Sequence, residues 1–214
     1  MQQSKAIIFD LDGVICHTDQ FHFHAWKRIS DEKNMHFDLQ LNEQLKGVSR
    51  EASYRIILKE NNRTESQENI DKAIYQKNIY YKELLDQMDE SYVSLDVLNT
   101  LKSIKNKGYL IAIGSSSKNA KFILSKIKLL DFFDAISDGT DITHSKPHPE
   151  VFIKAADKLK VDPKNCYVVE DAYSGVQAGL RSKMKVFAFN QEKTIFNNKD
   201  VIKIKKISDI LKYI

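Results

Sequence analysis

Short apolar segments alternate with segments of helical periodicity along the second half of this 214-residue chain. Strands that alternate with helices are joined by right-handed crossovers and form a mainly parallel sheet. An apolar N-terminal segment, residues 5–10, adds one more buried strand. The sequence therefore predicts an α/β fold with a Rossmann-like parallel-sheet core. The other predicted strands are 109–113, 133–136, 167–169, 186–189 and 201–204, and the predicted helices are 97–107, 118–130, 149–159, 174–181 and a terminal one.

The segment between the first two strands has a different character. From about Asp19 to Met88 the apolar residues follow helical periodicity, with Phe21, Trp26 and Ile29 on one face of a first helix. We therefore expect an α-helical cap, residues 15–92, inserted into a core formed by residues 1–14 and 93–214.

Composition narrows the possible partners. Apolar residues make up 42% and charged residues 29% of the chain, as in ordinary soluble domains. The net charge of +4 is spread over many lysines, which suits small anionic ligands and does not favour nucleic acid. No apolar run reaches the ~20 residues that cross a bilayer, and Asp10 and Asp12 interrupt any signal-peptide core. Cys16 and Cys166 have neither metal nor disulfide spacing, so we expect buried thiols and a cytoplasmic protein.

The first strand ends on two acids. The apolar run Ala6–Phe9 leads into Asp10, Asp12 and Gly13. Ligands of such sheets bind at the carboxyl ends of the strands, and a desolvated carboxylate must be paired or bound to metal. Asp10 and Asp12 could therefore share one cation and one substrate. The plainer alternative is a turn with two solvated acids.

Two later strands are followed by groups that suit a phosphate. Ser115, Ser116 and Ser117, with Lys118 and Asn119, offer hydroxyls and amides at a predicted helix start, which favours an anion. Helix capping by Ser116 or Ser117 explains the same residues.

A lysine and a second acid pair complete the candidate site. Lys146 precedes Pro147 and could supply a fixed positive charge, although most lysines are surface residues. Glu170 and Asp171 end another strand and suit a hard cation such as Mg²⁺. A turn with a capping acid is the alternative.

The order of these motifs on successive strand ends resembles that of the haloacid dehalogenase-like superfamily. The helical insertion likewise resembles the small α-helical cap of that superfamily. Asp10–Ile15, His22–Lys27 and residues 42–51 look like the β-phosphoglucomutase family. The stretch that resembles its substrate-selecting cap loop consists of Lys46, Gly47, Val48, Ser49 and Arg50.

Further cap roles follow from this resemblance or remain open. Gly47 would let the loop backbone approach a ligand, and Arg50 could hold phosphate through two donors. A helix–turn–helix corner with solvated charges is the alternative. The resemblance places His22 near the acid/base aspartate, Trp26 in the pocket and Lys77 on the sugar phosphate. Trp26 could equally be cap core.

The resemblance implies a reaction: interconversion of β-D-glucose 1-phosphate and glucose 6-phosphate through β-glucose 1,6-bisphosphate. It makes Asp10 the nucleophile and Asp12 the general acid and base. It assigns Mg²⁺ to the Asp10 side chain, the Asp12 carbonyl, Glu170 and Asp171. The reacting phosphoryl group would contact Ser115, Ser116 and Lys146, and the second phosphate would contact Lys118, Asn119 and the loop 46–50.

Two other functions remain open. A sugar-phosphate phosphatase would use the same residues with water as the attacking group. A non-catalytic sugar-phosphate sensor is disfavoured, because binding alone needs no nucleophile. His17 and Ala172 stand where many relatives carry an acid and a serine. Neither position is essential to the expected chemistry, although a change there could alter the rate or metal binding. We expect a monomer that acts on small sugar phosphates, without nucleic-acid or membrane partners.

Overall fold

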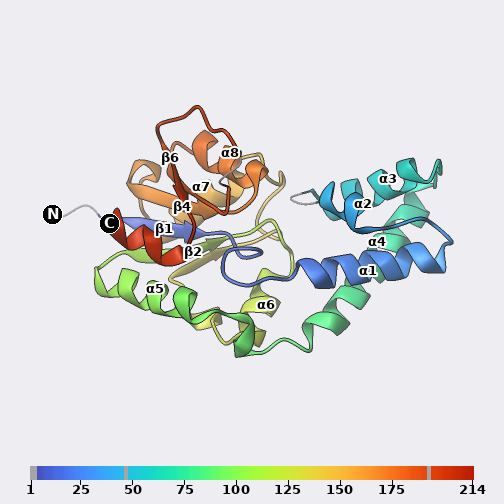
Figure 1. The fold of residues 1–214 in the computed structure, drawn as a ribbon, viewed down its shortest axis with the longest axis horizontal. Coiled ribbons are helices and arrows are strands. Elements are labelled where there is room, and N and C mark those ends of the chain that lie inside the picture. The colour runs from blue at the N-terminus through green and yellow to red at the C-terminus, as the bar shows by residue number, and fades with distance from the viewer. Residues whose placement is uncertain (1–3, 46–47, 192–193) are drawn as a thin grey trace. The chain divides into compact units, whose positions relative to one another are not determined.

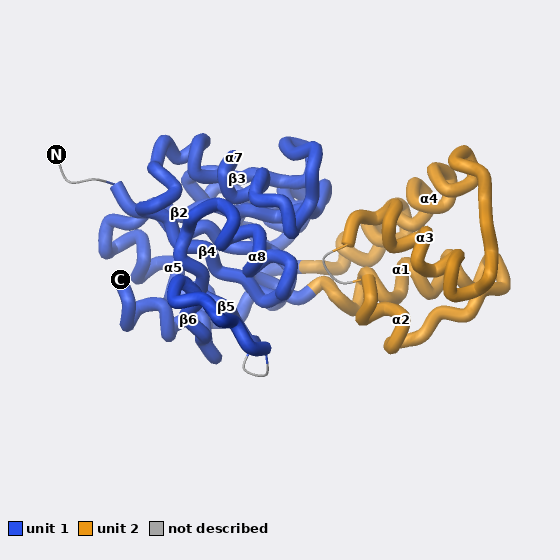
Figure 2. The backbone as a smooth tube through the Cα atoms, turned by 90° about the horizontal axis from the view of Figure 1, so that it is seen from above, with its two compact units in different colours: residues 1–17, 89–214 blue, residues 18–88 orange. Residues whose placement is uncertain are grey.

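The computed structural model describes residues 4–45, 48–191 and 194–214. The chain divides into two compact units (Figure 2). The larger unit comprises Met1–His17 and Asp89–Ile214, and the smaller unit comprises Thr18–Met88. These boundaries are a few residues inside those expected for a cap at 15–92. That the smaller unit serves as a cap stays a prediction.

The larger unit contains a six-stranded sheet in which every neighbouring pair of strands is parallel. The strand order is β3-β2-β1-β4-β5-β6. This arrangement confirms the predicted Rossmann-like α/β fold. The strands are β1 Ala6–Phe9, β2 Leu110–Gly114, β3 Ala135–Ser137, β4 Cys166–Glu170, β5 Lys185–Phe189 and β6 Val201–Ile204.

Strand β1 lies in the interior of the sheet, between β2 and β4. Ala6 pairs with Leu110 on one side and with Cys166 on the other. The chain adds β2 and β3 on one side of β1 and β4 to β6 on the other, so the strand order reverses at β1. Ligands of open α/β sheets bind at the carboxyl ends of the strands beside such a reversal.

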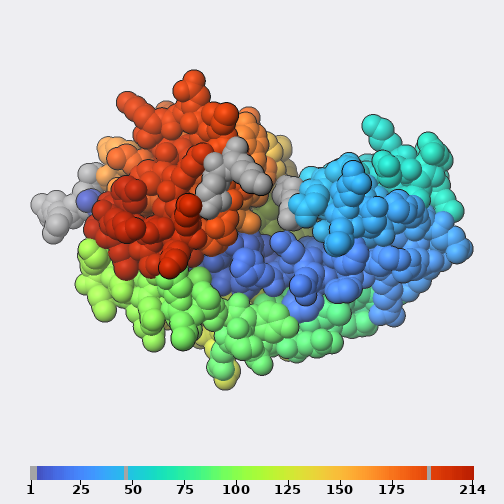
Figure 3. All heavy atoms as spheres, in the orientation of Figure 1, coloured from blue at the N-terminus to red at the C-terminus, as the bar shows by residue number. Residues whose placement is uncertain are grey.

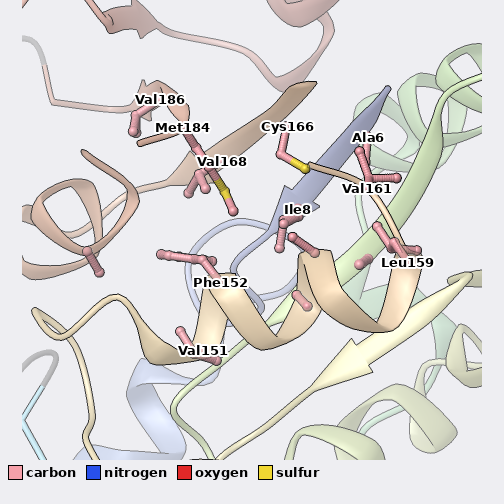
Figure 4. Close-up of a cluster of buried hydrophobic side chains, with 14 of the residues drawn as sticks. Ala6, Ile8, Val151, Phe152, Leu159, Val161, Cys166, Val168, Met184 and Val186 are labelled. Carbon is pink, nitrogen blue, oxygen red and sulfur yellow. The ribbon is translucent and has the colours of Figure 1, made fainter. Parts of the chain in front are cut away.

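Helices cover both faces of the sheet. Figure 1 shows α7 (Glu150–Leu159) and α8 (Tyr173–Arg181) on one side and α5 (Leu95–Asn106) on the other. The side chains of Ile8, Phe152 and Val168 belong to the buried cluster between the sheet and α7 and α8 (Figure 4). Fully burying a side chain of this kind contributes roughly 1.5–3 kcal/mol. The core therefore fixes the strand ends on which the candidate site residues lie.

The remaining elements of the larger unit are short. They are α6 Ala120–Lys126 and the 3₁₀ helices η1 Glu90–Tyr92, η2 Leu130–Phe132, η3 Pro163–Asn165 and η4 Ile207–Lys212. The terminal segment η4, at the red end of the colour scale in Figure 3, packs against α5. The predicted terminal helix is therefore confirmed in position, but it is a 3₁₀ helix.

Several predicted bounds are wrong. The helix predicted over 118–130 is reduced to α6, and Lys128 takes a left-handed φ of 54° that ends this helical run. The strand predicted over 133–136 is β3, which begins two residues later at Ala135. Phe133 lies outside the strand and makes a T-shaped contact with Phe9, with ring centroids 6.5 Å apart. Pro149 is the N-cap of α7 and not a residue of its first turn.

The smaller unit contains α1 Asp19–Glu32, α2 Leu39–Glu43, α3 Arg50–Glu60 and α4 Gln67–Leu85. Helix α4 packs against both α1 and α3. Trp26 of α1 stacks on Tyr54 of α3 with ring centroids 5.9 Å apart, and both rings are buried. Among the described residues, no helix is long and apolar enough to cross a membrane.

Candidate active site

Three predicted site residues of the larger unit lie at the carboxyl ends of three adjacent strands. Asp10 follows β1, Ser115 follows β2, and Glu170 ends β4. The Asp10 amide donates to Val169 O at 2.9 Å, and the Ser115 amide donates to Ser137 O at 3.0 Å. Both residues therefore continue the sheet hydrogen bonding, which fixes their backbones.

Asp10, Lys146 and Glu170 form a buried ion-paired group. The Lys146 Nζ contacts Asp10 Oδ1 and lies 2.6 Å from Glu170 Oε1. Burial lowers the pKa of Lys146, but the Asp10 and Glu170 charges outweigh it, so the pKa is raised and the ammonium stays charged. Burial raises the pKa of Glu170 above its usual range, against the opposing effect of Lys146. The structure thus makes Lys146 a fixed buried cation and excludes the surface-lysine alternative.

A hydrogen bond connects the loop of residues 115–119 to the loop that carries Lys146. The Lys146 amide donates to Ser116 Oγ at 3.4 Å. Ser115 Oγ accepts from the Ser117 amide at 3.1 Å, and Ser117 Oγ accepts from the Asn119 amide at 3.2 Å. These are turn contacts before α6, which starts at Ala120. Helix capping by Ser116 or Ser117 is therefore wrong, because the N-cap of α6 is Asn119.

The exposure of the loop residues differs. Ser115 and Asn119 are buried, Ser116 and Ser117 are half-buried, and Lys118 is exposed. A close approach of Gly139 supports this loop, because a Cβ at Gly139 would lie 2.4 Å from Ser116 O. Ser115 is thus a buried residue at the end of β2, the strand next to the one that leads into Asp10.

Asp10, Glu170 and Asp171 form a group of carboxylates whose ligand atoms lie within 4.8 Å of one another. Three closely spaced carboxylates supply the hard oxygen ligands that Mg²⁺ prefers, so the donor set fits this ion. Asp12 lies outside this side-chain group, and its backbone forms a bridge with Cys16. The metal-binding role expected for the Asp12 carbonyl oxygen stays a prediction.

Two glycines without a predicted role lie so close to Asp171 and Glu170 that a larger residue would displace these acids. A Cβ at Gly13 would lie 2.1 Å from Asp171 Oδ2, and Gly13 also has a φ of +86°. A Cβ at Gly175 would lie 1.7 Å from Glu170 Oε1. Glu170 Oε2 accepts from the Ala172 amide at 2.8 Å. In the sequence, the position of Gly13 directly after Asp10 and Asp12 was the sign that the backbone approaches another acid there.

The predicted cap residues His22, Trp26 and Lys77 come together within the smaller unit. Lys77 Nζ lies 2.9 Å from His22 Nδ1 and 5.1 Å from the centre of the Trp26 ring. Lys77 is buried, and its Nζ also lies 4.5 Å from the centre of the Tyr81 ring. Burial, then Lys77, then Arg50 lower the pKa of His22 well below its usual range. His22 is therefore neutral at pH 7.

Sequence reasoning missed two neighbours of this group. The Tyr81 ring lies 4.1 Å from His22 between ring centroids, and its hydroxyl donates to Thr18 Oγ1 at 3.1 Å. Both Tyr81 and Thr18 are buried. The sequence indicated only that Tyr81 lies one helical turn after Lys77, on the same face of α4.

The loop predicted to select substrate is described only in part. Lys46 and Gly47 lie outside the described residues. Val48 is exposed, Ser49 caps α3 by accepting from the Ala52 amide at 3.3 Å, and Arg50 is half-buried. Burial lowers the pKa of Arg50, and the charge of Tyr81 opposes this. Ser49 thus has a structural role, and Arg50 remains the candidate phosphate-binding group.

Four other residues of interest supply no side chain to the carboxylate group. His17 is exposed and Ala172 is the N-cap of α8. Cys16 and Cys166 are free and buried, as expected. Burial raises the pKa of both thiols, that of Cys166 to about 12.

These features of fold and site agree with a family comparison. Residues 7–189 match the family described as haloacid dehalogenase-like hydrolase, and this chain belongs to that family. The matched range includes the sheet strands from β1 to β5, apart from Ala6, and all the carboxylates described above.

Particular relatives point in two directions. The chain is 39% identical over 81% of its length to the beta-phosphoglucomutase of Bacillus subtilis, covering 78% of that protein. It is similar to the crystal structure of beta-phosphoglucomutase from Clostridium difficile, with a TM-score of 0.89 and 32% identity over 99% of this chain and 95% of that one. It is also 27% identical, over 81% of its length and 79% of the relative, to a phosphorylated carbohydrates phosphatase of Thermotoga maritima.

Proposed function

We propose that this enzyme is a β-phosphoglucomutase, which interconverts β-D-glucose 1-phosphate and glucose 6-phosphate through β-glucose 1,6-bisphosphate. The observation that carries the proposal is the contact of Asp10 with the buried Lys146 ammonium at the strand-order reversal. A carboxylate held there by a fixed cation is placed to attack phosphorus. The 39% identity to a beta-phosphoglucomutase supports a mutase over other phosphotransfer reactions.

Asp10 is the proposed nucleophile, and it carries the phosphoryl group as an aspartyl-phosphate. In the first half-reaction, the C6 hydroxyl oxygen of β-glucose 1-phosphate attacks the phosphorus of phospho-Asp10. Asp12 takes the hydroxyl proton, the bond between phosphorus and the Asp10 oxygen breaks, and β-glucose 1,6-bisphosphate forms.

The second half-reaction returns the enzyme to its starting state. The bisphosphate turns around, and Asp10 attacks the phosphorus on C1. Asp12 returns its proton to the departing C1 oxygen, which releases glucose 6-phosphate. Asp12 thus acts as base and then as acid.

The other residues position charge. Lys146 and Ser115 hold oxygens of the transferring phosphoryl group, since such a transfer depends mainly on positioning and charge stabilisation. Asp10, Glu170, Asp171 and the Asp12 carbonyl would hold Mg²⁺, which when bound reduces the repulsion between carboxylate and phosphoryl oxygens. Arg50, Lys77 and the Lys46–Ser49 loop would bind the phosphate that is not reacting, with Lys118 and Asn119. His22 and Trp26 would contact the sugar.

A sugar-phosphate phosphatase is the second candidate function, because one relative is a phosphorylated carbohydrates phosphatase. It needs the same Asp10 chemistry, with water attacking phospho-Asp10 in place of a sugar hydroxyl. For either reaction we propose a cytoplasmic monomer that acts on small sugar phosphates.

One experiment separates these functions. Purified enzyme with Mg²⁺ is given β-glucose 1-phosphate, with and without a trace of β-glucose 1,6-bisphosphate, and both glucose 6-phosphate and inorganic phosphate are measured. A mutase forms glucose 6-phosphate in excess of phosphate, with stimulation by the bisphosphate. Phosphate release without glucose 6-phosphate supports the phosphatase. The Asp10→Asn variant is the control, because its amide cannot attack phosphorus and both products must disappear.

A further inference from the structure

A second group of metal-ligating side chains lies on the loop that leads into α7. His144, His148 and Glu150 each place one ligand atom within 4.8 Å of those of the other two. The two imidazole rings lie 4.7 Å apart between centroids, tilted by 36°. His144 Nδ1 lies 3.4 Å from Glu150 Oε2. The group shares no residue with the carboxylates around Asp10.

The loop backbone holds the carboxylate in place. Glu150 Oε2 accepts from the His144 amide at 2.9 Å, and both of its oxygens lie 3.1 Å from the Thr143 amide. These backbone hydrogen bonds fix the position of the carboxylate. A fixed oxygen donor is therefore present beside both histidines.

The histidines are suited to bind metal. The Glu150 amide donates to His148 Nδ1 at 3.3 Å, a long contact. A metal ion bound at this nitrogen would replace the amide, because imidazole ligates a metal through a nitrogen lone pair. Both imidazoles are exposed and can move inward. Ligand atoms around a tetrahedral Zn²⁺ lie about 3.3 Å apart, given bonds of about 2.0–2.1 Å. The three ligand atoms, now within 4.8 Å of one another, therefore need to move only slightly closer together.

We propose that His144, His148 and Glu150 bind a borderline-soft divalent transition ion, represented by Zn²⁺. Two imidazoles and one carboxylate suit Zn²⁺, Ni²⁺ or Cu²⁺, whereas Mg²⁺ prefers oxygen ligands alone. Three protein ligands leave a fourth position for water. Lys146 lies between the first two ligands in the chain, so the bound ion would link the residues on either side of the active-site lysine.

One neighbouring charge opposes the ion. Lys154 Nζ lies 3.1 Å from Glu150 Oε1 and also contacts Asp141 O. Lys154 is partly exposed and can move away. This gives the proposal a distinctive signature, because removal of this cation tightens binding if Glu150 is a ligand.

The test is titration of the full chain with Zn²⁺ in excess Mg²⁺, followed by calorimetry, with Co²⁺ absorption as a spectroscopic readout of a tetrahedral site. Wild type is expected to bind one Zn²⁺ that His144→Ala and His148→Ala each bind at least about tenfold more weakly. The control His24→Ala, at another exposed histidine, leaves the affinity unchanged. Lys154→Gln binds more tightly than wild type.

Two results overturn the proposal. The first is an unchanged number of bound ions and unchanged Co²⁺ absorption in the His144→Ala/His148→Ala double variant. The second is weaker Zn²⁺ binding by Lys154→Gln with an intact fold, because the ammonium would then not compete with the ion. Neither result bears on the mutase proposal, since that reaction does not use these side chains.

Discussion

Lys146 Nζ lies 2.6 Å from Glu170 Oε1, and both side chains are buried. Removal of one member of a buried ion pair leaves an uncompensated charge, which costs about 3–5 kcal/mol. The same ammonium also contacts Asp10, so the stability of the site and its proposed chemistry depend on one side chain.

Replacement of Lys146 with methionine is therefore expected to lower the free energy of unfolding by about 3–5 kcal/mol. Without the lysine, Glu170 takes up a proton more readily in the folded state, so the loss grows as pH rises above its ordinary pKa of about 4.3. Denaturant unfolding at pH 6 and pH 8 measures this. Lys158→Met is the control, because Lys158 pairs with Asp141 at 2.7 Å near the surface and is worth at most about 1 kcal/mol. Equal losses in the two variants would contradict the prediction.

Gly13→Ala should impair metal binding. A Cβ there would lie 2.1 Å from Asp171 Oδ2, so Asp171 must move, and the Mg²⁺ concentration for half-maximal rate should rise. Gly108→Ala is a matched control, because Gly108 has a similar φ of +81° but no described atom beyond its neighbours within 4 Å of the added Cβ. Both variants carry roughly 1–2 kcal/mol of backbone strain. An identical Mg²⁺ titration for the two would mean that Asp171 does not hold the metal.

The Asp12→Asn variant is expected to lose more than about 10²-fold in mutase kcat, because its amide can neither donate nor accept the transferred proton as an acid and base do. Phosphorylation of Asp10 by acetyl phosphate should be affected much less, since acetate departs without a proton. Both rates are measured on the same preparation. Near-wild-type mutase turnover would move the acid and base role to another residue.

Arg50→Ala tests the proposed grip on the second phosphate. A charge-assisted contact is worth about 1.5–3 kcal/mol, so kcat/KM for β-glucose 1-phosphate should fall about tenfold or more. Hydrolysis of acetyl phosphate has no second phosphate to hold and should change little. Arg55→Ala is the control, because Arg55 is on the same helix but pairs with Glu51 at 2.9 Å in an exposed position. Equal losses on both substrates would make Arg50 a structural residue.

The lowered pKa of His22 implies that the stability of the protein depends on pH. Its folded-state pKa lies below its usual value, so the unfolded chain binds the proton more readily, and stability falls as pH drops from 7 to 5. One such group contributes a slope of at most about 1.4 kcal/mol per pH unit. His22→Gln should remove this part of the slope, whereas His24→Gln, on the same helix and exposed, should retain it. Denaturant unfolding at several pH values gives the slopes, and an unchanged slope in His22→Gln would refute the assignment.

The sheet was predictable because its strands are short apolar segments bounded by turn residues. Asp10, Ser115 and Glu170 could be placed at one sheet edge, since parallel strands end together. The α6 boundary was not predictable, because Lys128 adopts a left-handed φ that its residue type does not favour.

Contacts between distant segments could not be predicted from the sequence either. The spacing of Lys77 and His22 gives no sign that their nitrogens lie 2.9 Å apart, because packing of α4 on α1 brings them together. The group of His144, His148 and Glu150 was missed for the opposite reason. Its residues are close in sequence, but only the folded loop turns their ligand atoms toward one another.

The interior position of β1 has a consequence for synthesis on the ribosome. Ala6 is synthesised before its partners Leu110 and Cys166, which emerge much later. Until then β1 is an apolar strand with two unsatisfied edges, and long-range parallel pairing forms slowly. The smaller unit, by contrast, has its whole sequence available before β2 is translated. The nascent chain therefore carries β1 unpaired until most of the sheet has been translated, so this apolar strand needs protection from aggregation for longer than the strands that follow it.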